Sequence, residues 1–372
     1  LVVLRKLCEN SDLYPRCYIL KGIRVFSHEG WGGFCEIYKG QCPRGRIICL
    51  KALRIRQKSD VNGILKLYIR EAVLWNQLSH PNVLPFYGVF YLDKTQEQIC
   101  LVSPWMENGN IASYLAKNLH VARVPLIHDV ASGLHYLHDS NIVHGDLKGA
   151  NVLVNTTGRA CIADFGVSRI TINPMLSMTL TAASAGYTTR WAAPELLIDN
   201  SLPTRASDIW AFGCVCFEIL TGLLPFHNCS TDGQIVLKLV QGCAPAQPAE
   251  NGGSGSPIDN SNEAMSQLLA HCWHRDPESR LSSAQILAEL ESHEHLGLLR
   301  RGEAEPPIEP STPQSLEFLR GYSAMELDLD ELHGILEGLA GPVDGDKAGE
   351  TSASAVDIAI SKGMSECCWR VQ

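Results

Sequence analysis

The sequence predicts an α+β protein in which a small strand-rich part with one helix precedes a larger, mainly helical part. Two patterns predict this class. Short β-rich runs separated by glycine clusters occupy residues 23–50, whereas apolar residues recur three or four positions apart in most segments from 111 to 296. Of the 372 residues, 45% are hydrophobic and 19% are charged, which excludes a mainly disordered or collagen-like chain.

The strand-rich part begins with the runs of 23–50, whose glycine clusters are typical of turns in an antiparallel sheet. One helix is predicted over 61–78 and is ended by the turn at His80. Strands are expected again at 83–91 and 99–104. The helix prediction rests on side chains spaced three or four positions apart: Leu67, Glu71, Leu74 and Leu78.

The larger part shows helical spacing in several segments separated by polar or glycine-rich connections. These segments are residues 126–139, 204–221, 232–241, 263–273 and 282–292. Residues 244–262 are rich in Pro, Gly, Ser and Asn, so we expect an exposed loop between two of these helices.

The C-terminal part differs from the rest in charge. Residues 302–372 carry 14 acidic and 4 basic residues, a net charge of −10, which leaves +1 for residues 1–301. Because the chain has no basic excess to pair with phosphates, we expect no nucleic-acid partner. Residues 329–340 have the spacing of an amphipathic helix, which either packs back on the helical part or binds a partner. Residues 342–372 are expected to be disordered.

The cysteines and the hydropathy pattern favour a cytoplasmic protein. The 14 cysteines are scattered, often in apolar runs such as 214–216, and form no CxxC pair. This distribution favours reduced, buried thiols over a disulfide framework. The most apolar stretch, residues 208–226, is interrupted by Glu218, so we expect no membrane insertion.

Signals near the N-terminus are compatible with phosphate binding, although each is weak alone. Gly30 and Gly32 lie between strand-like runs, where backbone N–H groups can approach phosphates, but such a motif is more often an ordinary turn. Lys51 ends an apolar strand and could project its ammonium group under that loop. A lysine buried there needs a carboxylate, which Glu71 on the predicted helix could supply.

The strongest cluster of polar side chains lies in the 144–151 loop and at Asp164. Asp146, between β-rich runs, could accept a hydroxyl proton, and Lys148 could contact the same substrate. Asn151 and Asp164 could supply oxygen ligands for Mg²⁺. Hard oxygen ligands together with a lysine suit a phosphorylated nucleotide.

In their order along the chain, these residues resemble the signature motifs of the protein-kinase superfamily. The motifs are a glycine loop, a strand lysine, an HxDLKxxN loop at 144–151, Asp-Phe-Gly at 164–166 and Ala-Pro-Glu at 193–195. The resemblance covers about residues 20–297 and implies a bilobal protein-kinase fold. It implies a division into an N-terminal helical extension at 1–19, an N-lobe at about 20–103, a C-lobe at about 107–297 and a tail at 298–372.

The resemblance implies a role for each residue of the polar clusters, in transfer of the γ-phosphate of ATP to protein substrates. Lys51, paired with Glu71, would contact the α- and β-phosphates. Asp146 would be the catalytic base, and Asn151 and Asp164 would hold Mg²⁺. Structural roles are implied as well: Asp208 would anchor the 144–151 loop, and Glu195 would pair with Arg280.

The segment 100–110 resembles a kinase hinge. This places Ser103 at the gatekeeper position and Met106 at the backbone that reads adenine. Pro104 has no N–H group, but the family uses only the carbonyl group there. The other nucleotide contacts that the resemblance implies are Gly30, Gly32 and Lys51, together with Ile37, Cys49 and Leu153, which would sandwich the ring and also fit ordinary core packing.

Residues around the 144–151 loop favour serine and threonine substrates. Lys148 is typical of serine/threonine kinases, and Thr188 matches the threonine that bridges base and lysine in them; dual specificity stays open. The segments 190–195 and 271–273 resemble the tyrosine-kinase-like group. The segment 144–154 resembles the expanded kinase families of mushroom-forming fungi.

Two departures from the family pattern suggest a different class of function. Gly145 replaces the arginine that usually pairs with a phosphorylated activation loop, so we expect activity that depends little on such phosphorylation. Cys35 replaces the third glycine of the loop, which is expected to lower nucleotide affinity. An inert side chain is favoured at this position over a reactive thiol, which would require exposure near Lys51. A weak or inactive pseudokinase that serves as a signalling scaffold is therefore the alternative. A dinucleotide-binding oxidoreductase is disfavoured, because a strand follows the glycine loop where a helix would be needed.

Overall fold

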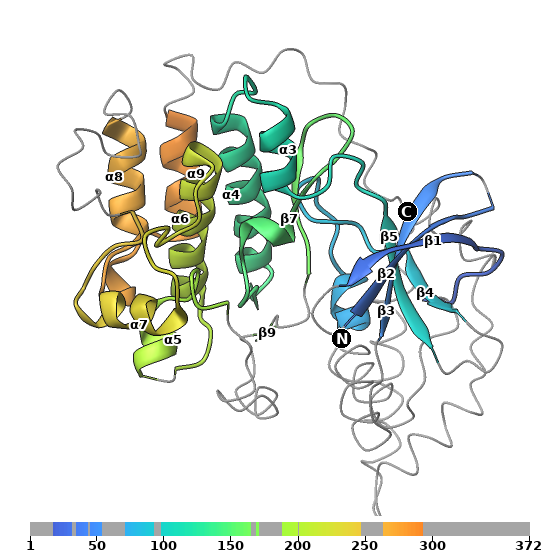
Figure 1. Ribbon diagram of the computed structural model, residues 1–372, viewed down its shortest axis with the longest axis horizontal. Coiled ribbons are helices and arrows are strands. Elements are labelled where there is room, and N and C mark those ends of the chain that lie inside the picture. Colours follow the sequence, from blue (N-terminus) through green and yellow to red (C-terminus); the bar gives the residue numbers. More distant parts are fainter. Residues whose placement is uncertain are drawn as a thin grey trace, which may run out of the picture. The chain divides into compact units, whose positions relative to one another are not determined.

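The glycine-punctuated runs near the N-terminus form a five-stranded antiparallel sheet in the computed structural model (Figure 1). The strand order is β1-β2-β3-β5-β4. The strands are β1 (Arg24–Trp31), β2 (Cys35–Gln41), β3 (Ile47–Leu53), β4 (Gly88–Tyr91) and β5 (Ile99–Pro104). The structure describes residues 18–31, 35–43, 45–53, 71–92, 98–164, 169–170, 188–199, 201–246 and 263–292.

The described residues fall into two compact units. The sheet unit comprises those within 18–79 and 85–105, and the helical unit comprises those within 80–84 and 106–292. The predicted α+β class, with a small sheet part and a larger helical part, is confirmed. Residues 1–17 of the predicted extension at 1–19, residues 247–262 of the predicted loop at 244–262 and the whole predicted tail at 298–372, including its amphipathic helix, lie outside the described residues.

Alternation along the strands gives the sheet two different faces. In β3, Ile48, Leu50 and Ala52 are fully buried. They join an apolar cluster with side chains of β4, β5 and the flanking turns, including Tyr87 and Val102. Because successive side chains of a strand point to opposite faces, the odd-numbered residues of β3 lie on the other face.

Two N-terminal predictions need correction. Of the predicted strand 83–91, only Gly88–Tyr91 forms strand β4, since Pro85 has no N–H group for a ladder. The predicted helix over 61–78 is described only from residue 71, and its helical part ends at residue 75. The bond from the Gln77 N–H group to the Leu74 carbonyl oxygen, 3.0 Å long, shows the tightening that ends a helix.

The helical unit contains the predicted helices with boundaries shifted by at most two residues. They are α4 (Val124–Asp139), α6 (Arg205–Thr221), α7 (Asp232–Val240), α8 (Glu263–Cys272) and α9 (Ser283–Ser292). Two short helices that periodicity did not indicate, α3 and α5, complete the unit as Ile111–Lys117 and Pro194–Ile198. The strands that flank the 144–151 loop, β6 (Ile142–Val143) and β7 (Val152–Val154), pair with β9 (Arg169–Ile170) and β8 (Ala160–Ile162), respectively.

Helix α6 is the centre of the helical unit. It is buried continuously from Ser207 to Ile219 and contacts α3, α4 and α8. A capping box between Thr204 and Ser207 starts it, and Gly222, in the left-handed conformation at φ 74°, ends it. Among the described residues, no helix has both the length and the apolar character to cross a bilayer.

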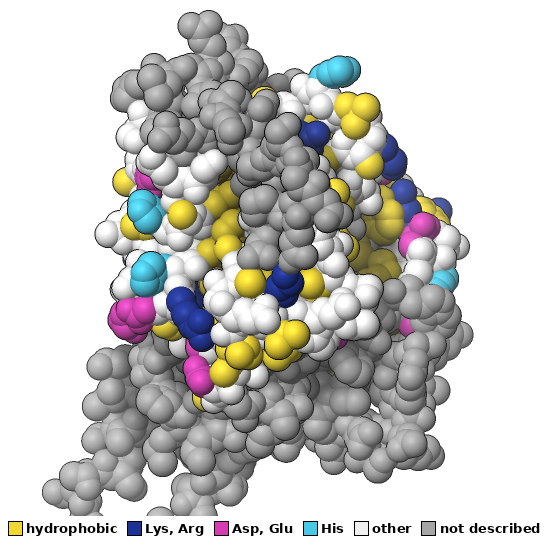
Figure 2. Space-filling model, turned by 60° about the vertical axis from the view of Figure 1, so that its left-hand side comes forward, with side chains coloured by type: hydrophobic (Ala, Val, Ile, Leu, Met, Phe, Trp, Pro, Cys, Tyr) yellow, Lys and Arg dark blue, Asp and Glu magenta, His cyan; other side chains and the backbone are white. Residues whose placement is uncertain are grey.

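Apolar side chains are also exposed on the side of the helical unit that carries α5 and α7. Figure 2 brings this side forward and shows hydrophobic side chains interspersed with Lys, Arg and polar atoms. The exposed apolar residues of these elements and of the turn after α6 include Ile198, Leu223, Leu224, Leu237 and Val240.

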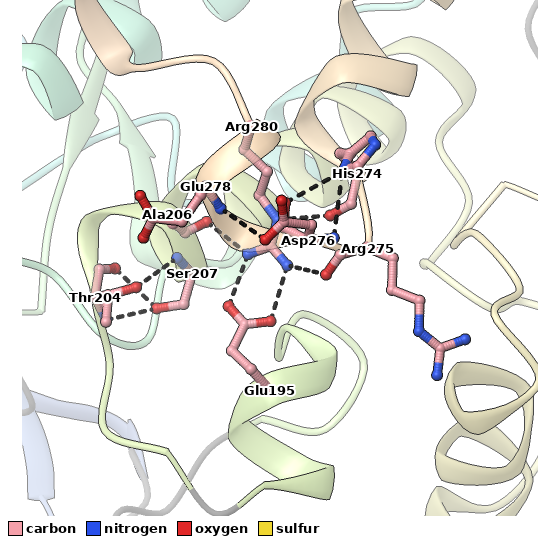
Figure 3. Close-up of polar contacts among 9 residues, drawn as sticks. All are labelled: Glu195, Thr204, Ala206, Ser207, His274, Arg275, Asp276, Glu278 and Arg280. Carbon is pink, nitrogen blue, oxygen red and sulfur yellow. Dashed lines mark hydrogen bonds and ion pairs between the residues drawn. The ribbon is translucent and has the colours of Figure 1, made fainter.

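A buried ion pair joins α5 to the turn before α9 (Figure 3). Arg280 donates to both carboxylate oxygens of Glu195, at 2.7 and 2.8 Å. The same guanidinium group donates to the carbonyl oxygens of His274 and Ala206, at 2.8 and 2.9 Å, and lies over the ring of Trp210. The pairing expected between Glu195 and Arg280 is therefore present, and every side of the buried cation is occupied.

Replacing Arg280 by Met should lower the free energy of unfolding by about 3–5 kcal/mol, because the largely covered Glu195 carboxylate and the carbonyl oxygens of His274 and Ala206 would all lose their donor. Thermal or urea unfolding followed by circular dichroism measures this. The exposed Arg275 provides the matched control, and Arg275→Met should change stability by less than about 0.5 kcal/mol. Equal losses in the two variants would contradict the assignment of Arg280 as the buried anchor.

Candidate active site

The predicted nucleotide contacts of the sheet unit lie on one face of the sheet. Ile37 of β2 pairs with Lys51 of β3, and Cys49 of β3 pairs with Ser103 of β5. Cross-strand partners share a face, and so do residues two apart in a strand, so these four side chains are neighbours. Ile37, Cys49 and Lys51 are half-buried, whereas Ile48, Leu50 and Ala52 between and beside them are fully buried.

Lys51 is paired with Glu71 as expected. The Lys51 ammonium group lies 3.1 Å from Glu71 Oε1, and the glutamate side chain is only 4% exposed. Glu71 begins the described part of the helix at 71–75, so this pair fastens that helix to the face that carries Ile37 and Cys49. Burial, opposed by the Lys51 charge and a bond from Ser103, raises the pKa of the Cys49 thiol to about 11, so Cys49 is a neutral part of this lining.

The glycine loop is described only at its ends. Gly30 lies in β1 opposite Ile37, and Gly32 lies outside the described residues. Cys35 is not at an exposed loop tip: it is the first residue of β2, pairs with Leu53 and is 7% exposed. Because β2 begins at this residue, its side chain is covered, which fits the inert thiol that the sequence favours over a reactive one.

The predicted hinge residues lie at the end of β5 and just after it. Ser103 is buried, and Pro104 pairs with Ile48 as the last residue of the strand. Met106, in the helical unit, is buried, and its carbonyl oxygen accepts the Gly109 N–H group at 3.0 Å. Leu153, in β7 of the same unit, is half-buried.

Asp146 is the centre of the polar cluster in the helical unit. Its Oδ2 accepts from the Lys148 ammonium group at 2.6 Å, and its Oδ1 accepts from the Thr188 hydroxyl group at 2.9 Å. Lys148 also donates to Thr188 Oγ1 at 2.8 Å, which closes a triangle of three side chains. The triangle holds a carboxylate acceptor and a positive charge side by side, with the Asp146 side chain 13% exposed.

Asn151 is oriented by the same aspartate. Its amide nitrogen donates to the Asp146 carbonyl oxygen at 2.9 Å, which turns the amide oxygen away from the loop. The β7–β8 pairing then brings the ends of two segments together, because the Ala163 N–H group donates to the Asn151 carbonyl oxygen at 2.8 Å. Asp164 follows directly, exposed and at φ 67°. An amide oxygen and an exposed carboxylate at one end of a hairpin fit a hard divalent cation.

Asp208, in the first turn of α6, holds the start of the loop. It accepts from the backbone N–H groups of His144 and Gly145 at 2.8 and 2.9 Å and from the His138 ring at 2.9 Å. His144 is fully buried; its Nδ1 accepts from the Asp146 N–H group, so the proton lies on Nε2, which donates to Ala163. The predicted anchor of the loop is thus a buried carboxylate on the central helix.

The conformation of Gly145 follows from this anchoring. With two successive N–H groups turned to one carboxylate, Gly145 lies at φ 82°, where a side chain is strained. Glycine at this position therefore supports the loop geometry, in addition to removing the arginine that the family pattern would place there.

Glu218 is a buried residue near the active loop that sequence reasoning noted only as a break in an apolar run. It accepts from the Gly149 N–H group at 3.1 Å and from the Trp191 indole. These partners are 69 and 27 positions away in sequence, so no local pattern could identify them.

Gly145→Ala should lower the free energy of unfolding by about 1 kcal/mol, because alanine is strained at positive φ. Gly233→Ala is the matched control, since this glycine lies in helix α7 with open space around it and alanine there should be neutral or stabilising. Chemical denaturation of the three proteins measures both changes. A loss at Gly233 as large as at Gly145 would contradict the conformational argument.

Comparison with known proteins agrees with these observations. The family model described as protein kinase domain matches residues 24–290. Among relatives, the serine/threonine-protein kinase STY17 of Arabidopsis thaliana is 29% identical over 273 residues, which cover 72% of this chain and 44% of that protein. The serine/threonine/tyrosine-protein kinase HT1 of the same plant is 30% identical, over 71% of this chain and 64% of that protein.

A fungal relative covers the same part of the chain. The cytokinesis protein sepH of Emericella nidulans is 30% identical over 72% of this chain, and the match covers 18% of that protein. The chain thus spans less than two thirds of the length of each of these relatives. With its family match over most of its length and the expected motifs in order, the chain belongs to the protein kinase domain family.

Proposed function

We propose that the chain transfers the γ-phosphate of ATP to serine or threonine hydroxyl groups of protein substrates. The observation that carries this proposal is the triangle of Asp146, Lys148 and Thr188, because it sets a proton acceptor beside a positive charge. In the proposed step, the hydroxyl oxygen bonds to the γ-phosphorus while the bond from that phosphorus to the ADP oxygen breaks. The hydroxyl proton passes to Asp146, and Lys148 neutralises charge on the transferred phosphoryl group.

The sheet unit supplies most of the proposed nucleotide contacts. Lys51, held by Glu71, binds the α- and β-phosphates, and the half-buried Ile37 and Cys49 contribute to the surface against which adenine packs. Gly30, Gly32, Ser103, Pro104, Met106 and Leu153 complete the proposed nucleotide site. Asn151 and Asp164 hold Mg²⁺, which when bound neutralises charge on phosphate oxygens.

We further infer that the chain is a tyrosine-kinase-like kinase with serine/threonine preference, acting on proteins in the cytoplasm. The Arabidopsis relatives, whose names describe serine/threonine and serine/threonine/tyrosine kinases, support the serine/threonine preference and leave dual specificity open. The likeness of residues 144–154 to kinases of mushroom-forming fungi and a partner for the predicted helix at 329–340 stand as further proposals from the sequence.

The decisive assay is transfer of labelled γ-phosphate from ATP and Mg²⁺ to a generic basic protein and to the chain itself. Asp146→Asn should lower turnover by about 10²–10⁴-fold, because the amide cannot accept the hydroxyl proton. Asp199→Asn, at an exposed aspartate beyond α5, is the matched control and should retain turnover. Label should be recovered as phosphoserine or phosphothreonine after acid hydrolysis. Equal signals from the wild type and Asp146→Asn would overturn the proposal and favour the pseudokinase alternative.

Turnover should change by less than tenfold when the protein is dephosphorylated, because Gly145 offers no guanidinium group to pair with a phosphorylated loop. Phosphatase-treated and untreated protein are compared in the same assay, along with a variant carrying alanine at the available hydroxyl positions. These positions are Thr171, Ser177, Thr179, Thr181 and Ser184, which lie outside the described residues. A larger change would contradict this inference while leaving the proposed reaction intact.

A further inference from the structure

The carboxylate of Glu218 receives hydrogen bonds from two segments that carry partners of Asp146. Gly149, which donates its backbone N–H group to Oε1 at 3.1 Å, directly follows Lys148. Trp191, whose indole N–H group donates to the same oxygen, lies three residues after Thr188. Lys148 and Thr188 both bind the Asp146 carboxylate group, which the Asn151 amide group also contacts at 3.4 Å. Glu218 Oε1 therefore binds one residue next to Lys148 in sequence and another residue close to Thr188.

The fit between Gly149 and Glu218 leaves no room for a side chain. A Cβ atom at Gly149 would lie 2.5 Å from Glu218 Oε2 and 3.0 Å from Oε1. Glycine thus lets the carboxylate lie directly against the loop backbone, and its N–H group supplies the donor that a proline would lack.

Ionisation of the buried Glu218 carboxylate destabilises the folded state. Glu218 is 7% exposed, and burial raises its pKa from 4.5 to about 7, although the bonds from Trp191 and Gly149 act to lower it. A glutamine would offer an oxygen to the same two donors without this desolvation. The hydrogen bonds alone therefore do not explain why an ionisable group occupies this position.

The groups around Glu218 leave its charge without a salt-bridge partner among the described residues. On α6 itself, Cys214 lies one turn earlier, and the Glu218 charge helps to raise the pKa of that thiol well above its usual value. The loop and the turn at 188–191 contribute the Gly149 amide and the Trp191 indole, neither of which titrates. From the residue that precedes α4, Arg123 donates to the neighbouring Ile219 carbonyl oxygen at 3.2 Å. Ionised Glu218 is thus held by neutral donors.

We propose that Glu218 is a positioning residue for phosphoryl transfer, whose ionised carboxylate holds Gly149 and Trp191 in place and thereby fixes Lys148 and Thr188 around Asp146. The inference rests on the proposed function. Charged hydrogen bonds are shorter and stronger than neutral ones, so ionisation tightens both contacts at once. Protonation loosens them without breaking the fold, because a neutral carboxyl group still accepts.

The test compares Glu218→Gln with the wild type across pH 6–8, with kcat and the KM for ATP measured separately. The ratio of wild-type to variant kcat removes titrations common to both proteins. It should be near one at pH 6 and rise to about tenfold at pH 8, the factor by which a charged hydrogen bond exceeds a neutral one. The KM for ATP should not change. Glu291→Gln, at an exposed glutamate of α9, should give a ratio near one at every pH.

Thermal unfolding distinguishes positioning from a damaged fold. Because the pKa of Glu218 is raised from 4.5 to about 7 in the folded protein, the wild type loses stability relative to Glu218→Gln as pH rises from about 4.5 to about 7. The variant should therefore melt at the same temperature as the wild type near pH 4 and at a higher temperature at pH 8. A lower kcat in the more stable protein cannot come from unfolding.

Trp191→Phe provides a second approach to the same contact. It removes the indole donor and should lower kcat at pH 8, and its effect should be largely absent in the Glu218→Gln background. A pH-independent ratio, or equal kcat for wild type and Glu218→Gln at pH 8, would overturn the inference alone. No transfer by the wild type at any pH would overturn the proposed function and, with it, this inference.

Discussion

The carboxylate of Asp208 is the interaction on which the geometry of the candidate site depends. It is 1% exposed and lies in the first turn of α6, where the helix dipole favours a negative charge. By accepting from the N–H groups of His144 and Gly145, it sets the backbone that presents Asp146. His138 on α4 binds the same carboxylate, so two helices and the loop meet at one buried charge. A buried aspartate is tolerated here because both of its carboxylate oxygens accept hydrogen bonds.

Helix α6 also binds the segment 188–191, through its residue Glu218. Three side chains of residues 188–191 bind different elements: Thr188 binds Asp146, the Arg190 guanidinium group binds carbonyl oxygens within 225–229, and Trp191 binds Glu218. The ion pair between Glu195 and Arg280 then secures the helix that follows. A turn held at so many points can keep one conformation while it contacts a substrate, which phosphoryl transfer requires because catalysis depends on alignment.

Sequence spacing was sufficient where the chemistry is local or ordered along the chain. Asp146, Lys148 and Asn151 occupy a single loop, and the pairing of β7 with β8 brings Asp164 to its end. The long helices were also predictable, because their apolar faces repeat over several turns. Periodicity failed at α3 and α5, which have 7 and 5 residues and too few turns to show a pattern. The burial of Cys35 could not be fixed from sequence, because the exact start of β2 decides whether its side chain is covered.

The role of Glu218 could not be read from sequence for a physical reason. A charged residue inside an apolar helix looks like an interruption, and only the fold shows which donors reach it from distant segments. The two buried carboxylates of α6 then differ in kind. Asp208 accepts from two backbone amides and a histidine ring, whereas Glu218 accepts from two neutral donors and has a pKa raised to about 7. The proposed role of Glu218 makes the strength of this second anchor follow pH. The 144–151 loop is bound near its start by Asp208 and near its end by Glu218. When Glu218 is protonated the loop keeps its fold, and only the hydrogen bonds from Gly149 and Trp191 to Glu218 weaken.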